Sequence, residues 1–351
     1  MRSLSSNAQE KYTINFLSVG DADAIVIGYQ EDNGSPLRVA LIDAGKEDDA
    51  KVIKDFILEK YNTHRIDLAV CTHPDRDHKG GFFGLMEDSE MEFGEFWCAD
   101  PFMVLEDDDY PEGMTEKERK KICRRIYNHP NDSSKNLIDI AENKCECCYH
   151  VGEGDESEII PIRVLGPSPD YYHQAAIDML NKFVELPVEA DMGEYEDAAD
   201  VPDEENCSRI NDATDESCTN KCSLILLFTL KSSSRYLLCG DAATSSLQEL
   251  VDNYGTDVKG CRLKVPHHGS IKNLTTRIID ELSPIASIIS CAGNRHHPSG
   301  SIVEYLRKYG NVYTTSYNHN YGVTNIITGN RVEPFREKKV RKLIVKRKNK
   351  W

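Results

Sequence analysis

The chain of 351 residues lacks the features of a membrane or secreted protein. Its longest apolar run, Leu224–Leu230, is far shorter than the roughly 20 residues that a membrane-spanning helix needs. The first residues, Met1–Asn7, lack the apolar core of a secretory signal peptide. We therefore expect a cytoplasmic protein that does not bind a membrane.

The chain contains twelve cysteines, so cysteine is not among the residues that it lacks. In the cytosol these thiols should stay mostly reduced. Cys71 and Cys239 lie in strand-like runs, where cysteine behaves as a small core residue. A denser group has irregular spacing, and whether it builds a structural zinc site stays open at this point. Its members are Cys145, Cys147, Cys148, Cys207, Cys218 and Cys222.

The chain has fewer basic than acidic residues, and its formal net charge is −17. This negative charge argues against a general nucleic-acid coat protein. The charge is unevenly distributed. Residues 185–216 carry thirteen acidic side chains against one base, Arg209, and form a candidate docking surface for a protein partner. Residues 331–351 are strongly basic and could follow a nucleic-acid backbone. The alternation over 340–346 is also typical of an edge strand.

Apolar periodicity predicts a chain of alternating strands and helices. The expected strands are 12–19, 24–28, 37–45, 66–71, 159–165, 223–230, 235–238, 262–265, 286–291, 312–315 and 323–327. The expected helices are 48–61, 115–126, 134–141, 171–186, 244–254, 275–282 and 301–309, with a short helix over 82–86. Such a pattern indicates an α/β protein with layered sheets and helices.

The densest polar cluster follows the apolar run 68–71, in residues 72–81 (THPDRDHKGG). Its imidazoles and carboxylates are ligands of borderline divalent metals. They belong to His73, Asp75, Asp77 and His78. We expect a loop in which the adjacent Asp77 and His78 need irregular backbone to converge, with Gly80 and Gly81 permitting its tight path. A solvated polar turn is the simpler alternative.

Five expected strands end in a polar residue or cluster, at Asp43, 73–78, Asp241, 267–268 and 296–297. In a layered α/β protein, strand ends on one edge gather at a common site. Each has a simpler interpretation, because Asp241 could cap a helix and residues 267–270 could form a turn. Five clusters at equivalent positions favour a shared site.

Residues 72–81 resemble the His-x-[His/Asp]-x-Asp-His signature of metallo-β-lactamase-fold hydrolases. Five further motifs resemble the hydrolase domain of competence DNA-uptake proteins and its free-standing relatives. They are VGDADA at 19–24, LIDAG at 41–45, LCGDA at 238–242, LKVPHHGS at 263–270 and NRHHP at 294–298. The resemblance covers about residues 12–320, apart from 91–216. It implies a four-layer αβ/βα sandwich over 1–330, with an insertion over about 91–216 and a basic tail over 331–351.

The resemblance also implies a site for two divalent metal ions. His73 and Asp75 would hold one ion, and Asp77 and His78 the other. Asp241 would bridge them, and either His268 or His297 would be the last ligand. Asp43 and Asp23 would orient ligands, a role as necessary as ligation itself.

Two departures from the family pattern concern the metal. Asp75 replaces the usual second histidine, which hardens the site and favours manganese or magnesium over zinc. No clear histidine in the middle region completes the first metal; His150 and His173 are the nearby options, and neither ends an expected strand.

A two-metal site implies hydrolysis by an activated water. Asp77 would orient that water, and His267 or a histidine of the 296–297 pair would contact phosphate or protonate the leaving oxygen. Arg295 is suited to bidentate phosphate contact, although an ordinary surface role fits it equally well. We expect a phosphodiesterase or nuclease that acts on nucleic acid or a small phosphodiester. The alternatives are a hydrolase of a small-molecule ester or phosphate and a non-catalytic interaction protein.

Overall fold

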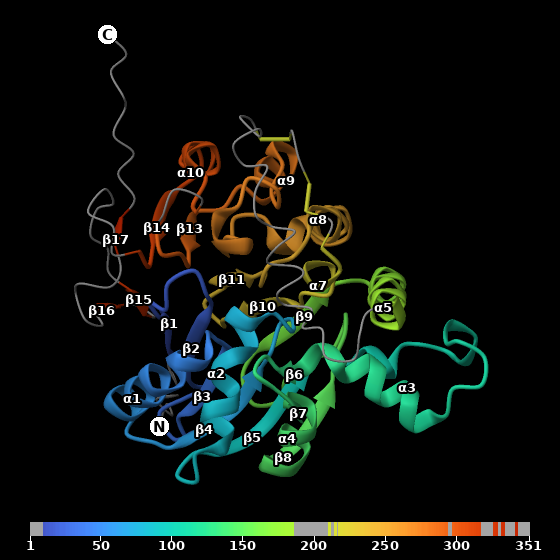
Figure 1. Ribbon diagram of the computed structural model, residues 1–351. Helices are drawn as coiled ribbons and strands as arrows, with labels where there is room; N and C mark the ends of the chain where they lie inside the picture. The colour runs from blue at the N-terminus through green and yellow to red at the C-terminus, as the bar shows by residue number, and fades with distance from the viewer. Residues whose placement is uncertain are drawn as a thin grey trace, which may run out of the picture.

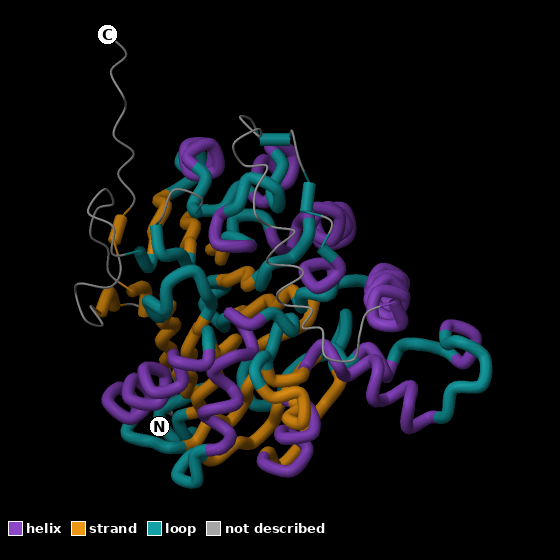
Figure 2. Tube along the Cα trace, in the orientation of Figure 1, coloured by secondary structure: helices purple, strands orange, loops and turns teal. Residues whose placement is uncertain are grey.

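Two mixed β-sheets pack face to face and carry helices on their outer sides (Figure 1). The computed structural model describes residues 10–185, 210–211, 214–215, 217–293, 297–316, 326–328, 331–333 and 341–342. Figure 2 shows the strands through the middle of the molecule and helices on either side. The α/β fold with four layers in the order αβ/βα is confirmed.

The first sheet has the strand order β1-β2-β3-β4-β5-β8. Its strands are β1 (Lys11–Phe16), β2 (Ala24–Gln30), β3 (Arg38–Ala44), β4 (Arg65–Val70), β5 (Glu92–Cys98) and β8 (Cys145–His150). β1, β2 and β3 are antiparallel neighbours, and from β3 to β8 all neighbours are parallel. The helices beside this sheet are α1 (Ala50–Tyr61), α2 (Arg76–Glu87) and α4 (Leu137–Lys144).

The second sheet has the order β17-β14-β13-β12-β11-β10-β9. Its strands are β9 (Ile162–Gly166), β10 (Ile225–Thr229), β11 (Arg235–Leu238), β12 (Arg262–Lys264), β13 (Ala286–Ile289), β14 (Asn311–Thr314) and β17 (Arg341–Lys342). β9, β10 and β11 are antiparallel neighbours, and β11 to β14 are parallel. Its helices are α8 (Thr244–Val258), α9 (Thr276–Leu282) and α10 (Gly300–Leu306).

The remaining elements complete the described chain. They are α3 (Glu116–Cys123), α5 (Pro169–Glu185), α7 (Cys218–Lys221), β6 (Asn128–His129), β7 (Asp132–Asn136), β15 (Ile326–Thr328), β16 (Arg331–Glu333), and the 3-10 turns η1 (Glu47–Asp49), η2 (Pro101–Met103), η3 (Asp107–Asp109), η4 (Arg124–Tyr127) and η5 (His267–Gly269). Among the described helices, none is long and apolar enough to cross a membrane.

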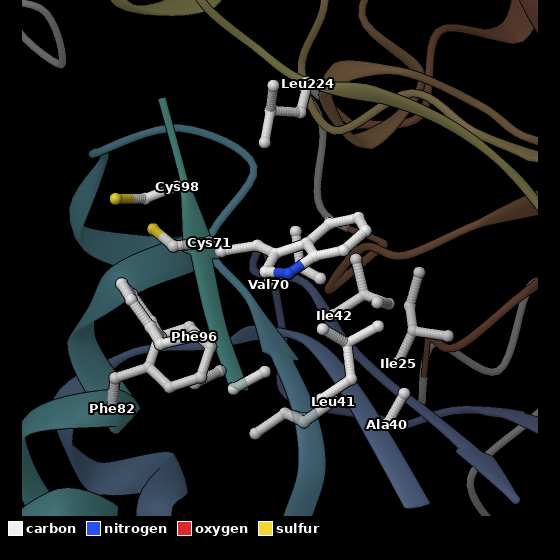
Figure 3. Packing of buried hydrophobic residues seen from close by; sticks show 14 of the residues in the cluster. Ile25, Ala40, Leu41, Ile42, Val70, Cys71, Phe82, Phe96, Cys98 and Leu224 are labelled. Atoms are coloured by element: carbon white, nitrogen blue, oxygen red, sulfur yellow. The ribbon is translucent and has the colours of Figure 1, made fainter. Parts of the chain in front are cut away.

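The main core lies between the two sheets and contains side chains from both. Tyr12 of β1 packs edge-on against Phe228 and Tyr236 of the second sheet, with ring centroids 6.1 Å apart in each pair. Figure 3 shows Leu224, just before β10, above Val70 of β4. Burial of apolar area stabilises the fold by roughly 25 cal/mol per Å². This shared core therefore fixes one sheet against the other.

The segment 91–216, expected to be an insertion, also contributes to both sheets. β5 and β8 extend the first sheet, and β9 forms an edge of the second. β5 joins the sheet because Phe93 and Phe96 bury their rings in the main core. The expected helix over 134–141 begins only at Leu137, since residues up to Asn136 belong to the β6–β7 hairpin. Residues 186–209 of the acidic stretch lie outside the described residues.

The basic C-terminal stretch supplies one short strand to the second sheet. Within it, β17 pairs antiparallel with β14, with Thr314 opposite Arg341 and Tyr313 opposite Lys342. The alternation over residues 340–346 was therefore partly an edge-strand signal. The remainder of this stretch beyond 342 lies outside the described residues.

Candidate metal centre

The His-Asp motif spans the end of β4 and the beginning of α2. Helix α2 begins at Arg76, so Asp77 and His78 lie in its first turn. The expectation that these two residues need irregular backbone was wrong. The backbone N–H groups of His78 and Lys79 donate to the carbonyl of Asp75, which occupies the N-cap position. A helix N-terminus favours acidic side chains, which makes this turn compatible with Asp77.

The two glycines of the motif serve close packing rather than a tight loop. Both lie inside α2, where a β-carbon at Gly81 would be 2.1 Å from the carbonyl oxygen of Ala44. A β-carbon at Gly80 would be 2.7 Å from the backbone nitrogen of Glu47. Only glycine lets α2 approach the end of β3 this closely, and that approach places the first turn of α2 beside Asp43.

Four side chains from three separate segments of the chain form a group that could hold a metal ion. One donor atom from each of Asp77, His78, Asp241 and His268 lies within 4.8 Å of all the others. The Nε2 atom of His268 is 2.9 Å from Asp77 Oδ2 and 3.6 Å from Asp241 Oδ2. The Nε2 atom of His78 is 3.3 Å from Asp241 Oδ2. We call these four residues the metal group.

Asp43 sets the direction of His78. The Nδ1–H group of His78 donates to Asp43 Oδ2 at 2.8 Å, which leaves Nε2 to face the metal group. Asp43 also accepts hydrogen bonds from the backbone N–H and the hydroxyl of Thr72, both at 2.8 Å. Carboxylates that accept the second ring N–H of a histidine fix its tautomer and orientation. Asp43 therefore makes the contact with His78 that an orienting role would require.

His268 has a corresponding anchor in the second half of the chain. Its Nδ1 atom is 2.8 Å from the carbonyl oxygen of Ser290, so Nδ1 carries the hydrogen and Nε2 faces Asp77. The backbone of His268 has a φ of 51°, and Gly269 follows with a φ of 81°. A β-carbon at Gly269 would be 2.8 Å from Pro298 Cβ, so this turn requires glycine.

His73 and Asp75 lie next to the metal group. The Nε2 atom of His73 is 3.4 Å from Asp75 Oδ2, and its ring centroid is 4.0 Å from that of His78. Within the described part of the chain, the Nε2 atoms of His73 and His78 are buried and make no hydrogen bond. A buried polar atom without a partner is costly, and a bound cation would satisfy both atoms. The residues present therefore fit a divalent metal ion.

A buried lysine that the sequence did not point to completes the site. Lys264 of β12 is 1% exposed and donates to the carbonyl of Gly240 at 2.8 Å and to Asp241 Oδ1 at 3.3 Å. It also forms an ion pair with Asp23. Asp23, Asp43 and His78 make up a second group with metal-ligand spacing. Lys264 provides the positive charge that Asp23 needs there, so this second group requires no metal.

The charges of the metal group support one another. Burial disfavours a charged His78, but the carboxylates of Asp241, Asp43 and Asp77 outweigh burial and raise its pKa well above the ordinary value. Burial likewise opposes the ionised form of Asp241, but His78, Lys264 and His268 lower its pKa well below the usual range. Without a metal, protonated imidazoles neutralise the carboxylates. A metal ion would replace those protons.

The remaining candidate residues lie near the metal group or apart from it. The ring centroid of His297 is 5.9 Å from that of His268, but His297 is not in the metal group, so the geometry favours His268 as the ligand. Arg295 lies outside the described residues. His150 does end a strand, contrary to expectation, but it accepts a hydrogen bond from the N–H of Asp100. His173 pairs with Asp109 at 2.7 Å.

No cysteine belongs to a metal-capable group of the described chain. Cys145, Cys147 and Cys148 lie on β8, whereas Cys218 and Cys222 are buried at the two ends of α7. Cys207 lies outside the described residues. The structural zinc site that the sequence left open gains no support among these described cysteines.

The αβ/βα sandwich, with aspartates and histidines gathered at strand ends of both sheets, has the architecture that the resemblance to metallo-β-lactamase-fold hydrolases implied. The chain is 32% identical over 100 residues to ComE operon protein 3 of Bacillus subtilis (strain 168). That alignment covers 28% of this chain but only 13% of the relative. No family model matches the chain.

Comparison with solved structures finds distant similarities. A diphosphatase of the PhnP family is 12% identical with a TM-score of 0.33, covering 80% of this chain and 84% of the other. The metallo-β-lactamase MIM-1 of Novosphingobium pentaromativorans is 11% identical with a TM-score of 0.33, covering 88% and 91%. The subclass B3 enzyme BJP-1 of Bradyrhizobium japonicum is 12% identical with a TM-score of 0.32, covering 84% and 89%.

Proposed function

We propose that the chain is a metal-dependent hydrolase that cleaves phosphodiesters. The observation that carries this proposal is the metal group, in which four buried or half-buried donors converge from both sheets. Orienting contacts from Asp43 and the Ser290 carbonyl aim two imidazole Nε2 atoms at the same point. A structural core has no need of such convergence, and a hydrolytic metal site does.

Each residue of the metal group has a defined part in the proposal. The divalent ions would supply Lewis acidity, activating water for attack and neutralising charge on the phosphate. Asp241 offers Oδ2 to the ions, while its Oδ1 is held by Lys264 and by the backbone N–H of His267 at 3.1 Å. Asp77 is the most exposed of the four, which suits a residue that also orients the attacking water.

We propose two ions, with His73 and Asp75 holding the one that the metal group does not. The donor set is rich in carboxylates, which favours manganese or magnesium, with zinc as the alternative. Asp75 is held in place by the hydroxyl of Thr219, which donates to its Oδ2 at 3.2 Å. A metal series that found zinc best and manganese inert would contradict the preference that we assign to Asp75.

The substrate class follows from chemistry and from the motif resemblance. Phosphodiesters are anionic and slow to hydrolyse, so they gain most from paired cations. The resemblance to hydrolase domains of competence DNA-uptake proteins favours a polynucleotide, and the basic stretch 331–351 could contact its backbone. A small-molecule ester is the competing substrate class. The converging donors argue against a purely non-catalytic interaction protein.

A substrate panel tests the proposal. The purified chain is incubated with manganese, magnesium or zinc and with labelled single-stranded DNA, double-stranded DNA, RNA and bis-p-nitrophenyl phosphate. Hydrolysis of a polynucleotide supports the nuclease form, and turnover of the small diester alone supports a small-molecule phosphodiester. Cleavage of carboxylic esters without any diester would contradict the proposal.

The Asp77→Ala variant is the matched control for this panel. It removes one carboxylate of the metal group from the exposed side and leaves the main core untouched, so we expect a folded protein without activity. Circular dichroism and the thermal midpoint check the fold. An Asp77→Ala protein with full activity would exclude the proposed metal mechanism.

A further inference from the structure

We propose that Asp215 is a positioning residue, which fixes the tautomer and the plane of the His267 ring beside the metal group. This inference rests on the proposed function, and it concerns the residue for which the sequence suggested contact with the phosphate or proton transfer to the leaving oxygen. Asp215 belongs to the acidic stretch 185–216, which gave no sign in the sequence of taking part in the site. It is only 4% exposed.

Asp215 is the centre of a buried polar network. Its Oδ2 atom accepts from the amide of Asn220 at 2.6 Å and from the amide of Asn273 at 2.8 Å, and it lies 3.2 Å from His267 Nδ1. Its Oδ1 atom accepts from the backbone N–H of Ser217 at 2.9 Å. Both carboxylate oxygens of Asp215 therefore accept hydrogen bonds from protein donors. The carboxylate therefore has one orientation.

The network decides which nitrogen of His267 carries the hydrogen. Nδ1 faces two acceptors, Asp215 Oδ2 at 3.2 Å and Asn273 Oδ1 at 3.1 Å. The amide nitrogen of Asn220 is farther from Nδ1, at 3.4 Å, and it already donates to Asp215 at 2.6 Å. The Asn273 amide nitrogen is turned away, since it donates to Asp215 and to the carbonyl of Ala242 at 3.1 Å. Two acceptors require a donor between them, so Nδ1 bears the hydrogen. In the neutral ring, Nε2 then carries the lone pair and is a hydrogen-bond acceptor.

His267 is attached to the metal group through its backbone. Its N–H donates to Asp241 Oδ1 at 3.1 Å, and its ring centroid lies 6.0 Å from that of His268. A ring fixed by Asp215 is therefore fixed relative to both residues of the metal group in the second half. The direction of Nε2 is therefore fixed relative to those residues as well.

The segment around Asp215 also contacts the first half of the site. The backbone N–H of Asp215 donates to the carbonyl of Lys272 at 3.1 Å, beside the second-half loop. Four residues later, the Thr219 hydroxyl reaches Asp75, and the N–H of Leu224 donates to the Thr72 carbonyl at 2.9 Å. Residues 215 and 217–224 thus connect both ligand loops. This part of the chain lies outside the recognised motifs and builds one wall of the site.

The first experiment reads the tautomer directly. Histidine labelled with ¹⁵N is introduced into the full chain loaded with zinc, which is diamagnetic, and the His267 ring is assigned by its loss in His267→Gln. Long-range proton–nitrogen spectra should show an Nδ1–H ring in the wild type. Asp215→Asn should give a mixture of tautomers, because its amide must turn a donor toward either Ser217 N–H or His267. An unchanged Nδ1–H ring in Asp215→Asn would overturn the proposal.

The second experiment separates positioning from general loss of structure. Partners of this kind typically contribute about 10- to 100-fold to activity. We expect Asp215→Asn to lower kcat for bis-p-nitrophenyl phosphate by about that factor, with KM changed less than about threefold. Zinc stoichiometry and affinity by calorimetry should stay near the wild-type values, because Asp215 touches no atom of the metal group. Lost zinc with normal kcat per bound ion would overturn the proposal.

Two further variants complete the design. Asp48→Asn removes an exposed carboxylate of η1 and should change none of the three readouts. If Asp215→Asn does not fold, Asn273→Ala takes its place, because it removes the second acceptor and keeps the carboxylate. Asn273→Ala should retain the Nδ1–H tautomer, and its loss would overturn the assignment to Asp215. The spectra remain decisive even if the wild type hydrolyses no diester, an outcome that would contradict only the proposed function.

Discussion

The two halves of the molecule use the same local arrangement for different purposes. In each half, an aspartate at or just beyond the end of the third strand accepts a hydrogen bond from a backbone N–H that follows the fourth strand. Asp43 accepts from Thr72 at 2.8 Å, and Asp241 accepts from His267 at 3.1 Å. The other oxygen of Asp43 then orients the Nδ1 side of His78, whereas the other oxygen of Asp241 faces the Nε2 side of His78. One aspartate orients a ligand, and the other is itself a ligand.

The difference arises from the groups that surround each aspartate. Asp43 gives its second oxygen to the hydroxyl of Thr72 and to His78, so nothing is left for a metal ion. Asp241 has Lys264 and a backbone N–H on one oxygen only. Equivalent positions in similar sheets therefore do not imply equivalent chemistry. The hydrogen-bond partners of each carboxylate oxygen determine whether an aspartate orients a ligand or is available to a metal ion.

The largest effect should come from exchanging the two aspartates for asparagine. Asp241→Asn removes the ligand charge and should abolish both hydrolysis and tight metal binding. Asp43→Asn keeps every metal donor and should lower metal affinity or activity about 10- to 100-fold. Calorimetric metal titration and diester turnover measure both. Equal losses in the two variants would remove the distinction between orienting and ligating aspartates.

The next largest effect concerns Lys264 on β12. The corresponding strand of the first half, β4, has no lysine. Lys264→Met leaves the buried carboxylates of Asp23 and Asp241 without their cation and should cost about 3–5 kcal/mol of unfolding free energy. Urea unfolding of the metal-free protein measures it. Lys51→Met, at a side chain that is 82% exposed, serves as the control and should change stability by less than about 1 kcal/mol. Adding Asp23→Asn to Lys264→Met should restore part of the loss.

A smaller effect should appear in the dependence of stability on pH. The raised pKa of His78 contributes stability to the metal-free protein that is complete below its unfolded value of about 6.5 and is lost as pH rises through the folded value. The lowered pKa of Asp241 contributes stability that is present above about 4 and is lost as pH falls through the folded value. Unfolding of metal-free protein should therefore show this contribution at its maximum between about pH 4 and 6.5.

Bound metal should reverse the loss of stability that the metal-free protein shows as pH rises. Because a metal ligand must be a neutral imidazole, the stabilisation by zinc or manganese should grow as pH rises through neutrality. Thermal midpoints with and without metal, measured across pH in wild type and in His78→Gln, provide the comparison. A stabilisation by metal that is independent of pH in the wild type would exclude His78 as a ligand.

The smallest effect should come from the basic C-terminal stretch. A chain ending at Glu333 loses nine of the ten basic residues of this stretch and also β17, the strand that pairs with β14. Polynucleotide cleavage should weaken and become less sensitive to salt, while turnover of bis-p-nitrophenyl phosphate should stay nearly constant. Equal loss on both substrates would assign the effect to the sheet edge rather than to backbone binding.

The sequence predicted the layers of the fold and pointed to the side chains that the structure brings together in the metal group, because both leave strong local signals. Apolar runs ending in Asp43, in the 73–78 motif, in Asp241 and in the 267–268 pair mark strand ends, and parallel strand ends meet at one edge. The helix boundary at Arg76 was missed, because the Asp75 N-cap signal was interpreted as a loop. β8 was missed because its sequence, CECCYH, is polar and lies at a sheet edge.

Two residues of the site could not be found from local pattern. Lys264 is separated from its partner Asp23 by most of the chain, and a single lysine in a strand normally indicates a solvent-facing position. Asp215 was one of thirteen acidic residues in a stretch expected to be a loop, and only its contacts with Asn220 and Asn273 distinguish it. Long-range partners carry this information, and neither periodicity nor spacing records them.

The shared core between the sheets has a consequence for measurement. Asp77 and His78 are carried by one sheet, and Asp241 and His268 by the other, so the gap between donors depends on how Tyr12 packs on distant Phe228. The affinity for a bound ion would therefore respond to small changes in how the two sheets pack. A substitution such as Phe228→Leu, which touches no ligand, would be registered as a change in metal affinity before any unfolding was visible.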